Sequence, residues 1–310
     1  MAEKQSFSIK GNRKNKALVE HVAEAVFTVC ALLAVVAVAS ITVYMIINGT
    51  PALFKVGIKG ILFGTVWQPA AKDPSFGILY VILTSIVGTT AAVLIGAPVG
   101  ILTAVFIEEI ASPRLAAIVK PAVELLAGIP SVIYGLLGIY LLNPMMYKLE
   151  IALFADAPDH QFTGGANLIS AVIVLAVMIL PTVINVTVSA LHAVPKQQKA
   201  ASLAMGATRI QTIFKVLLPS ARSGIAAAVV LGTGRAIGEA MAITLVSGSS
   251  VNMPLPFNSV RFLTTAIVAE MGYAAGLHRQ VLFTIGLVLF VFIMFINISL
   301  TKILKGREDS

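Results

Sequence analysis

The stretch Lys199-Ala-Ala-Ser-Leu-Ala-Met-Gly206, closed by Val216-Leu-Leu-Pro219, lies between two long apolar runs of the chain. Residues 200–205 are good helix formers, and Gly206 can adopt the left-handed conformation that ends one helix and redirects the next. Pro195 suits the first turn of a helix, because it lacks the amide hydrogen that would be unpaired there. The sequence therefore predicts a helix–glycine–helix segment, with Pro219 breaking the second helix before the next apolar run.

The second helix of this segment carries an apolar stripe. Ile210, Ile213, Phe214 and Leu217 follow one another at helical spacing. Such a stripe has two interpretations: an interfacial helix lying on a membrane, or a surface that docks a cytoplasmic partner.

The composition of the chain is that of a membrane protein. Of 310 residues, 58% are hydrophobic and 12% charged, with a mean hydropathy of +0.94, whereas soluble domains carry about a quarter charged residues. A membrane-spanning helix needs roughly 20 apolar residues, and the long uniform runs exclude the alternating pattern of barrel strands. We expect an all-α polytopic membrane protein with six transmembrane helices, at about 22–47, 77–107, 117–142, 167–191, 222–247 and 280–302.

The basic residues predict the orientation of these helices. With the N-terminus inside, most of the 22 Lys and Arg residues fall in cytoplasmic segments, so both termini should be cytoplasmic. The same distribution explains the net charge of +8 without nucleic acid, since no basic and aromatic module accompanies it. The first apolar run exceeds the roughly 7–15 residues of a cleavable signal, which favours a retained anchor.

Two charged residues fall inside the fifth apolar run. Arg235 and Glu239 are four residues apart, so on a continuous helix they would share a face and could pair. A charge at mid-membrane costs about 2.5–3.5 kcal/mol and normally faces a protein interior or an aqueous path. The planar guanidinium matches the oxygens of a phosphate group. Arg235 could therefore meet a passing anion while Glu239 restrains it and Glu124 of the third run assists, or the pair could only lock two helices together.

Glycine and proline residues predict close packing and bends. Gly96 and Gly100, like Gly234 and Gly238, are one turn apart and would let neighbouring helices approach closely. Proline removes a backbone hydrogen bond, so a kink is expected where one interrupts a span. A loosened helix at Pro130, Ser131 and Tyr134 could form part of a gate.

Enzymatic chemistry has little support in the sequence. No phosphate-binding Gly-x-x-x-x-Gly-Lys-[Ser/Thr] loop is present, and the four histidines lack metal-ligand spacing. Asp156, Asp159 and His160 form a small polar cluster, which we interpret as a solvated loop. We expect no catalytic residue, no metal site and no cofactor bound by this chain.

Ala200-Ala-Ser-x-x-x-Gly206, nine further residues and Val216-x-Leu-Pro219 resemble the "EAA" loop of ABC-transporter permeases, although Ala200 stands where the family often has Glu. In that family the loop is a coupling helix that fits a groove on the cytoplasmic ATPase. The resemblance implies a coupling loop at 192–221 that docks the ATPase through 196–218. The coupling residues it implies are Ala200, Ala201, Ser202, Gly206, Leu218 and Pro219.

Three further stretches, Glu124–Gly135, Gly232–Ala240 and Gly276-Leu-His278, resemble the phosphate permeases, and Glu270-Met-Gly resembles their C-type subunit (PstC). The resemblance implies a type I ABC importer permease fold in a bacterial cytoplasmic membrane. It also implies an A-type second permease subunit, two ATPase subunits that use ATP and Mg, and an extracytoplasmic phosphate-binding protein. The expected organisation is a basic N-terminus at 1–21, a first helix and outer loop at 22–76, a permease core at 77–303 and a tail at 304–310.

Two other functions stay open at this point. One Arg–Glu pair does not discriminate phosphate from sulfate or molybdate, so a permease for another oxyanion is an alternative. A secondary transporter independent of ATP is another, although such folds usually show internal repeats and none is evident here.

Overall fold

The computed structural model describes residues 13–158 and 160–305, and their side chains within 20–158 and 160–299. The predictions for the basic residues before Arg13, for Asp159 and for the tail beyond Lys305 lie outside the described residues.

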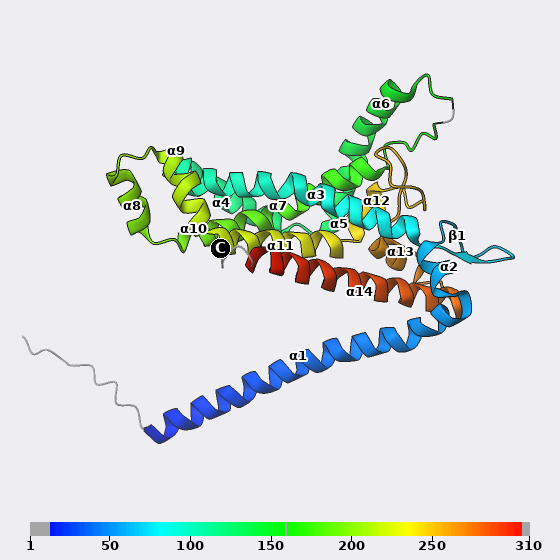
Figure 1. Ribbon diagram of the computed structural model, residues 1–310, viewed down its shortest axis with the longest axis horizontal. Helices are drawn as coiled ribbons and strands as arrows, with labels where there is room; N and C mark the ends of the chain where they lie inside the picture. Colours follow the sequence, from blue (N-terminus) through cyan, green and yellow to red (C-terminus); the bar gives the residue numbers. More distant parts are fainter. Residues whose placement is uncertain (1–12, 159, 306–310) are drawn as a thin grey trace, which may run out of the picture. The chain divides into compact units, whose positions relative to one another are not determined.

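The described chain is almost entirely helical (Figure 1). In chain order the elements are α1 (Arg13–Val56), α2 (Ile58–Phe63), β1 (Trp67–Gln68), β2 (Ser75–Phe76), α3 (Leu79–Val105), the π-helix η1 (Phe106–Ile110), α4 (Pro113–Gly128), α5 (Ser131–Leu137), the π-helix η2 (Gly138–Leu142), α6 (Asn143–Phe154), α7 (Leu168–His192), α8 (Lys196–Ala204), α9 (Arg209–Thr212), the π-helix η3 (Ile213–Leu217), α10 (Leu218–Ser220), α11 (Arg222–Gly238), α12 (Met241–Val246), α13 (Leu263–Glu270) and α14 (Gly276–Lys305).

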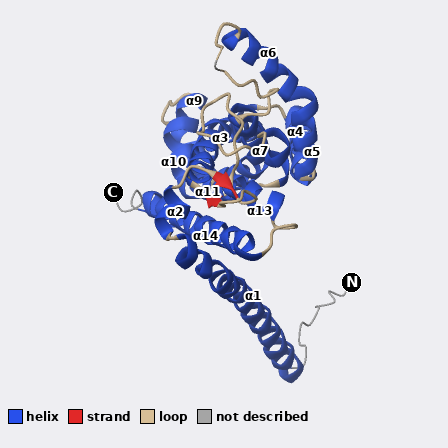
Figure 2. Ribbon diagram, turned by 90° about the vertical axis from the view of Figure 1, so that its right-hand side faces the viewer, coloured by secondary structure: helices blue, strands red, loops and turns tan. Residues whose placement is uncertain are grey.

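The chain divides into two compact units between Asn48 and Gly49. The first unit holds most of α1, whose apolar side chains, such as Phe27, are exposed. The second unit holds all the other elements, including the short antiparallel pair of β1 and β2, which Figure 2 shows as its red segment.

Five described helices are long and apolar enough to cross a membrane: Glu20–Val56, Leu79–Ile110, Ser131–Phe154, Leu168–His192 and Gly276–Ser299. A sixth crossing is reached if the pair Arg209–Ser220 and Arg222–Gly238, bent by 71°, counts as one span. The all-α membrane class is confirmed, and the predicted number of spans is met when the bent pair is included.

The third span lies further along the chain than predicted. The expected helix over 117–142 is wrong, because α4 ends at Gly128 and a new helix begins at Ser131. The residue before a proline is pushed into an extended conformation, and Ile129 has φ −70° and ψ 127°. The apolar run is therefore divided into α4 and a span at Ser131–Phe154.

The fifth run is also divided. The predicted helix over 222–247 is interrupted after Gly238, since Glu239 is extended with ψ 132° and α12 begins at Met241. The break places a charged side chain and free backbone groups inside an otherwise apolar segment. In a membrane, such a break persists only where other protein groups or water satisfy the freed backbone.

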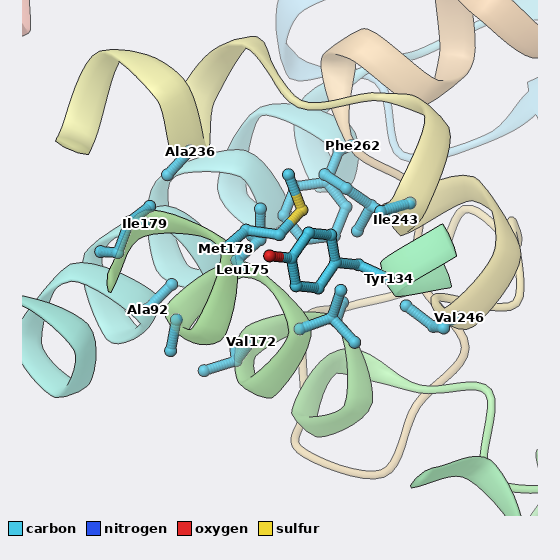
Figure 3. Close-up of a cluster of buried hydrophobic side chains, with 14 of the residues drawn as sticks. Ala92, Tyr134, Val172, Leu175, Met178, Ile179, Ala236, Ile243, Val246 and Phe262 are labelled. Atoms are coloured by element: carbon cyan, nitrogen blue, oxygen red, sulfur yellow. The ribbon is translucent and has the colours of Figure 1, made fainter. Parts of the chain in front are cut away.

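The core of the second unit is built around α7. Helices α3 and α11 pack along it (Figure 1), and Tyr134 inserts its ring among the buried side chains of α7 and α12 (Figure 3). A Cβ atom added at Gly96 would lie 2.8 Å from the Ala176 carbonyl oxygen, and one at Gly100 would lie 2.9 Å from the Val183 Cβ. Close approach of α3 and α7 at these two glycines is thus confirmed.

The second glycine pair behaves differently. No heavy atom lies within 4 Å of a Cβ placed at Gly234 or Gly238. The predicted close helix contact at these residues is wrong for the described part of the chain, and both face open space.

Two carboxylates of the second unit are buried, Glu150 in α6 and Glu270 at the end of α13. Glu270 accepts from Trp67 Nε1 at 3.1 Å, pairs with Arg261 and lies 2.7 Å from His278 Nε2. In the other cluster, Glu150 is fully buried and lies 2.9 Å from His160 Nε2. The prediction of a solvated loop is wrong for His160.

Candidate functional site

Arg235 lies in the last turn of α11 and is half-buried. Its Nη1 donates to Thr182 Oγ1 of α7 at 3.2 Å. A guanidinium has five N–H donors, so this hydrogen bond uses only part of its capacity. With open space beside Gly234 and Gly238, the arrangement leaves Arg235 able to bind a group from outside the chain.

The predicted pairing of Arg235 with Glu239 is wrong in this conformation. The helix ends at Gly238, so Glu239 no longer shares a helical face with Arg235, and the described residues form no ion pair between them. Instead, Glu239 Oε1 accepts from the amide of Ala242 at 2.9 Å, and the Glu239 carbonyl accepts from Thr264 Oγ1 at 2.6 Å. Glu239 thus satisfies backbone groups at the break between α11 and α12.

The predicted gate residues flank the other break. Pro130 precedes the first residue of α5, Ser131, and Tyr134 is buried one turn later. The Tyr134 hydroxyl donates to the Leu126 carbonyl of α4 at 2.7 Å, and its ring belongs to the same buried cluster as Ala236, the residue after Arg235. Tyr134 therefore links both sides of the α4–α5 break to the neighbourhood of Arg235.

Glu124 does not join this group. It is exposed on α4, before the break, and the described contacts include none between it and Arg235. Its predicted position inside the third span is wrong, because that span begins at Ser131.

The segment between α7 and α11 forms the predicted helix–glycine–helix at the opposite end of the second unit from α6 (Figure 1). The first helix is α8, and Gly206 has a φ of +86°, the left-handed conformation expected from the sequence. Thr208 and Gln211 then form a capping box that starts α9. The Thr-x-x-Gln pattern is a recognisable signal for a helix start.

The apolar stripe of the second helix divides into two. Ile213 and Leu217 are buried against Val105 and Leu191, whereas Ile210 and Phe214 are 56% and 52% exposed. The cause is the π-helical turn η3, because it rotates less per residue than an α-helix and so shifts the register.

The second helix ends one residue after Pro219, before the next apolar run, as predicted. The helical path continues through α10 to Ser220, and the 71° bend falls between Ser220 and Arg222. Beyond the bend, α11 leads directly to Arg235.

The exposed part of the segment is α8. No residue of α8 is buried, and beyond its end Met205 is 88% exposed. The sequence did not predict the ion pair that holds α8 in place: Lys199 Nζ lies 2.5 Å from Glu109 Oε2 of η1. The sequence feature that pointed to this ion pair was the acidic pair Glu108 and Glu109 at the end of the second apolar run.

Solved structures share this architecture. A bacterial ABC transporter involved in the import of the acidic polysaccharide alginate gives a TM-score of 0.62 at 17% identity, covering 94% of this chain and 99% of that one. An inward-facing structure of the MetNI methionine ABC transporter gives 0.52 at 23% identity, covering 74% and 94%. These likenesses show that the chain shares its fold with chains of ABC transporters.

The chain belongs to the family of binding-protein-dependent transport system inner membrane components, whose family model matches residues 96–308. A probable ABC transporter permease protein of Bacillus subtilis, YqgH, is 38% identical over 302 residues, covering 96% of this chain and 94% of the relative. The phosphate transport system permease protein PstC of Haemophilus influenzae is 31% identical over 287 residues, covering 89% and 90%. The chain is therefore a multi-pass transport subunit of an ABC importer and not an enzyme.

Proposed function

We propose that the chain is a C-type permease subunit of an ATP-driven importer of inorganic phosphate. Several relatives named as PstC match most of the chain. The observation within this chain that best supports an anionic substrate is Arg235, a permanent positive charge in a spanning segment with open space beside it.

In this proposal Arg235 contacts the passing oxyanion and releases it again. Among the described residues its side chain makes one hydrogen bond, to Thr182, which fits such a role, because a conducting site must bind its ion weakly enough to let it leave. Glu239, which caps the start of α12, would hold the break beside Arg235. Glu124 as a path-lining residue and Pro130, Ser131 and Tyr134 as a gate stay predictions.

The coupling segment, residues 196–218, would dock a cytoplasmic ATPase. The support is physical: α8 has no buried residue, and Leu203 and Met205 expose apolar side chains. Small side chains at Ala200, Ala201 and Ser202 leave the helix surface free to enter a groove. Gly206, Leu218 and Pro219 shape the segment.

The proposed assembly follows from the importer class. An A-type permease subunit would complete the path, two ATPase subunits would bind ATP and Mg, and an extracytoplasmic binding protein would deliver phosphate. The chain itself would hold no cofactor. Both termini would lie in the cytoplasm of a bacterium, with the coupling segment on the same side.

The test is radiolabelled phosphate uptake into proteoliposomes that hold the complete assembly, with ATP inside and the binding protein outside. We expect uptake that requires hydrolysable ATP and that unlabelled phosphate suppresses, while excess sulfate or molybdate does not. Suppression by sulfate or molybdate would assign the permease to another oxyanion. Uptake with a non-hydrolysable ATP analogue would instead indicate a secondary transporter.

A further inference from the structure

Two neighbouring carboxylates of η1, the π-helical turn that continues α3, bind different parts of the protein. Glu108 lies 3.0 Å from Lys120 Nζ of α4 and 2.9 Å from His192 Nε2 at the end of α7. Glu109 instead lies 2.5 Å from Lys199 Nζ of α8. The first carboxylate therefore joins α4 to the end of the spanning helix α7, and the second reaches the coupling segment.

Glu109 holds the segment at a second point through its backbone. Its carbonyl oxygen accepts a hydrogen bond from the Arg209 guanidinium at the start of α9. One residue of η1 thus contacts both helices that flank Gly206.

Polar contacts, and not apolar packing, determine where α8 lies. None of its residues is buried, so little hydrophobic burial fixes it. Besides the Glu109 contact, Ser202 Oγ lies 2.9 Å from Thr212 Oγ1, and Ser220 Oγ donates to Gln198 Oε1 at 2.8 Å. Those two contacts tie α8 to the chain that follows it, whereas the Glu109–Lys199 pair ties it to α3, 90 residues earlier.

The Glu109–Lys199 pair is also sheltered from water. The side chain of Glu109 is 10% exposed and that of Lys199 is 37% exposed. If Lys199 moved away, the sheltered Glu109 carboxylate would be left as an uncompensated charge. The protein therefore strongly favours the conformation in which the two side chains are paired. A glutamine at this position would keep the size of the side chain and lose that preference.

We propose that Glu109 is a positioning residue that clamps the coupling segment to α3. A displacement of α8 would then pass into α3 through the clamp, in addition to α7 and α11, which continue the segment covalently. At Gly96 and Gly100, α3 packs on Ile179 and Val183 of α7, and between these two lies Thr182, which accepts a hydrogen bond from Arg235. The inference rests on the proposed function, in which α8 receives the motion of an ATPase.

The clamp is tested first without any transport measurement. In the complete assembly in lipid nanodiscs, we would measure amide hydrogen exchange of residues 196–206 for wild type, Glu109→Gln and the control Glu108→Gln. We expect exchange in this segment to rise about tenfold for Glu109→Gln and to stay near wild type for Glu108→Gln. Equal exchange in wild type and Glu109→Gln, or an equal rise in both variants, would overturn the clamp.

A charge reversal separates the specific pair from general misfolding. Glu109→Lys and Lys199→Glu each place like charges together and should raise exchange in 196–206, whereas the double variant should restore it toward wild type. Failure of the double variant to recover any protection, in protein that assembles normally, would contradict a direct pair.

The transmission step is tested by the number of ATP molecules hydrolysed per phosphate imported. Glu109→Gln should raise this ratio about threefold or more, since a loosened segment lets hydrolysis proceed without moving α3, while Glu108→Gln should not. An unchanged ratio in Glu109→Gln would overturn transmission through the clamp. A wild-type assembly that imports no phosphate would instead refute the proposed function, and hydrogen exchange would still decide the clamp.

Discussion

Arg235 is the residue whose charge has most to gain from a bound anion. Hydrogen bonds to charged groups contribute about 1.5–3 kcal/mol, so loss of the guanidinium should lower phosphate uptake about tenfold to a hundredfold. We expect this for Arg235→Gln, and a smaller loss for Arg235→Lys, which keeps the charge without the planar fork. The measurement is uptake in proteoliposomes at matched protein content.

Thr233 provides the control for Arg235. It lies two residues away on α11, and its hydroxyl donates to the Val229 carbonyl of the same helix at 2.7 Å. Thr233→Val should therefore keep uptake within about twofold of wild type. Equal uptake by Arg235→Gln and Thr233→Val would remove Arg235 from the path.

Glu270 is the residue whose loss should most weaken the loops opposite the coupling segment. It is 5% exposed and joins Trp67, Arg261 and His278. Breaking a buried ion pair from one side costs about 3 kcal/mol or more, so Glu270→Gln should lower the midpoint of thermal unfolding in detergent by several degrees.

Trp67→Phe is the matched change for this cluster. It removes the indole N–H bond to Glu270 and leaves the ion pairs, so its effect should be about a third of that of Glu270→Gln. Similar midpoints for Glu270→Gln and wild type would show that the cluster adds no stability.

Sequence alone identified some of these residues and not others, for a physical reason. Arg235 stands out because a charge in an apolar run is costly and so indicates a role. The predicted pairing of Arg235 with Glu239 is wrong, because a spacing of four residues implies a shared face only while the helix continues. Helix α11 ends at Gly238, before Glu239. Glu109 and Lys199 are 90 residues apart, and only the fold brings them together.

Among the helices, the contact between α3 and α7 depends on the absence of side chains. Gly96→Ala would place a Cβ 2.7 Å from Ile179 Cδ1 and 2.8 Å from the Ala176 carbonyl, which cannot move away without displacing α7. We expect a loss of about 1–3 kcal/mol in unfolding free energy, measured by denaturant titration in detergent micelles.

Gly128→Ala controls for the intrinsic effect of replacing glycine by alanine. Gly128 lies in α4, and no heavy atom lies within 4 Å of the added Cβ. This variant should be neutral or slightly stabilising, because alanine favours a helix. A Gly96→Ala protein as stable as Gly128→Ala would contradict close packing at Gly96.

The helix boundaries mark the limit of hydropathy as a predictor. Apolar runs located the membrane segments, because burial in lipid requires only sustained low polarity. The same runs hid the breaks after Gly128 and Gly238, since extended backbone and helix can share one composition. Pro130 was a visible signal of the first break, but Glu239 became recognisable as a capping residue only once its bond to Ala242 was seen.

For the molecule as a whole, the class was predictable because two independent properties agreed. Hydropathy required a polytopic helical protein, and the stretch around Gly206 resembled the "EAA" loop of ABC-transporter permeases. The substrate is a different matter, because the fold is shared with importers of unlike cargo at low identity. In the proposed function, Arg235 favours an anionic cargo without choosing among anions.

The orientation of the molecule gives the last prediction. Asp73 is exposed in the loop that joins β1 and β2, and Met205 is exposed beyond α8. Between these two residues the chain passes through three helices that are able to span a membrane: Leu79–Ile110, Ser131–Phe154 and Leu168–His192. An odd number of crossings would put the two residues on opposite sides, and the distribution of basic residues predicts that Met205 is on the cytoplasmic side. In a Cys30→Ser background, a membrane-impermeant maleimide should label Asp73→Cys in intact spheroplasts and Met205→Cys only after permeabilisation. Labelling of both from outside would mean that one of the three helices does not cross, and the reverse pattern would place the coupling segment out of reach of any cytoplasmic ATPase.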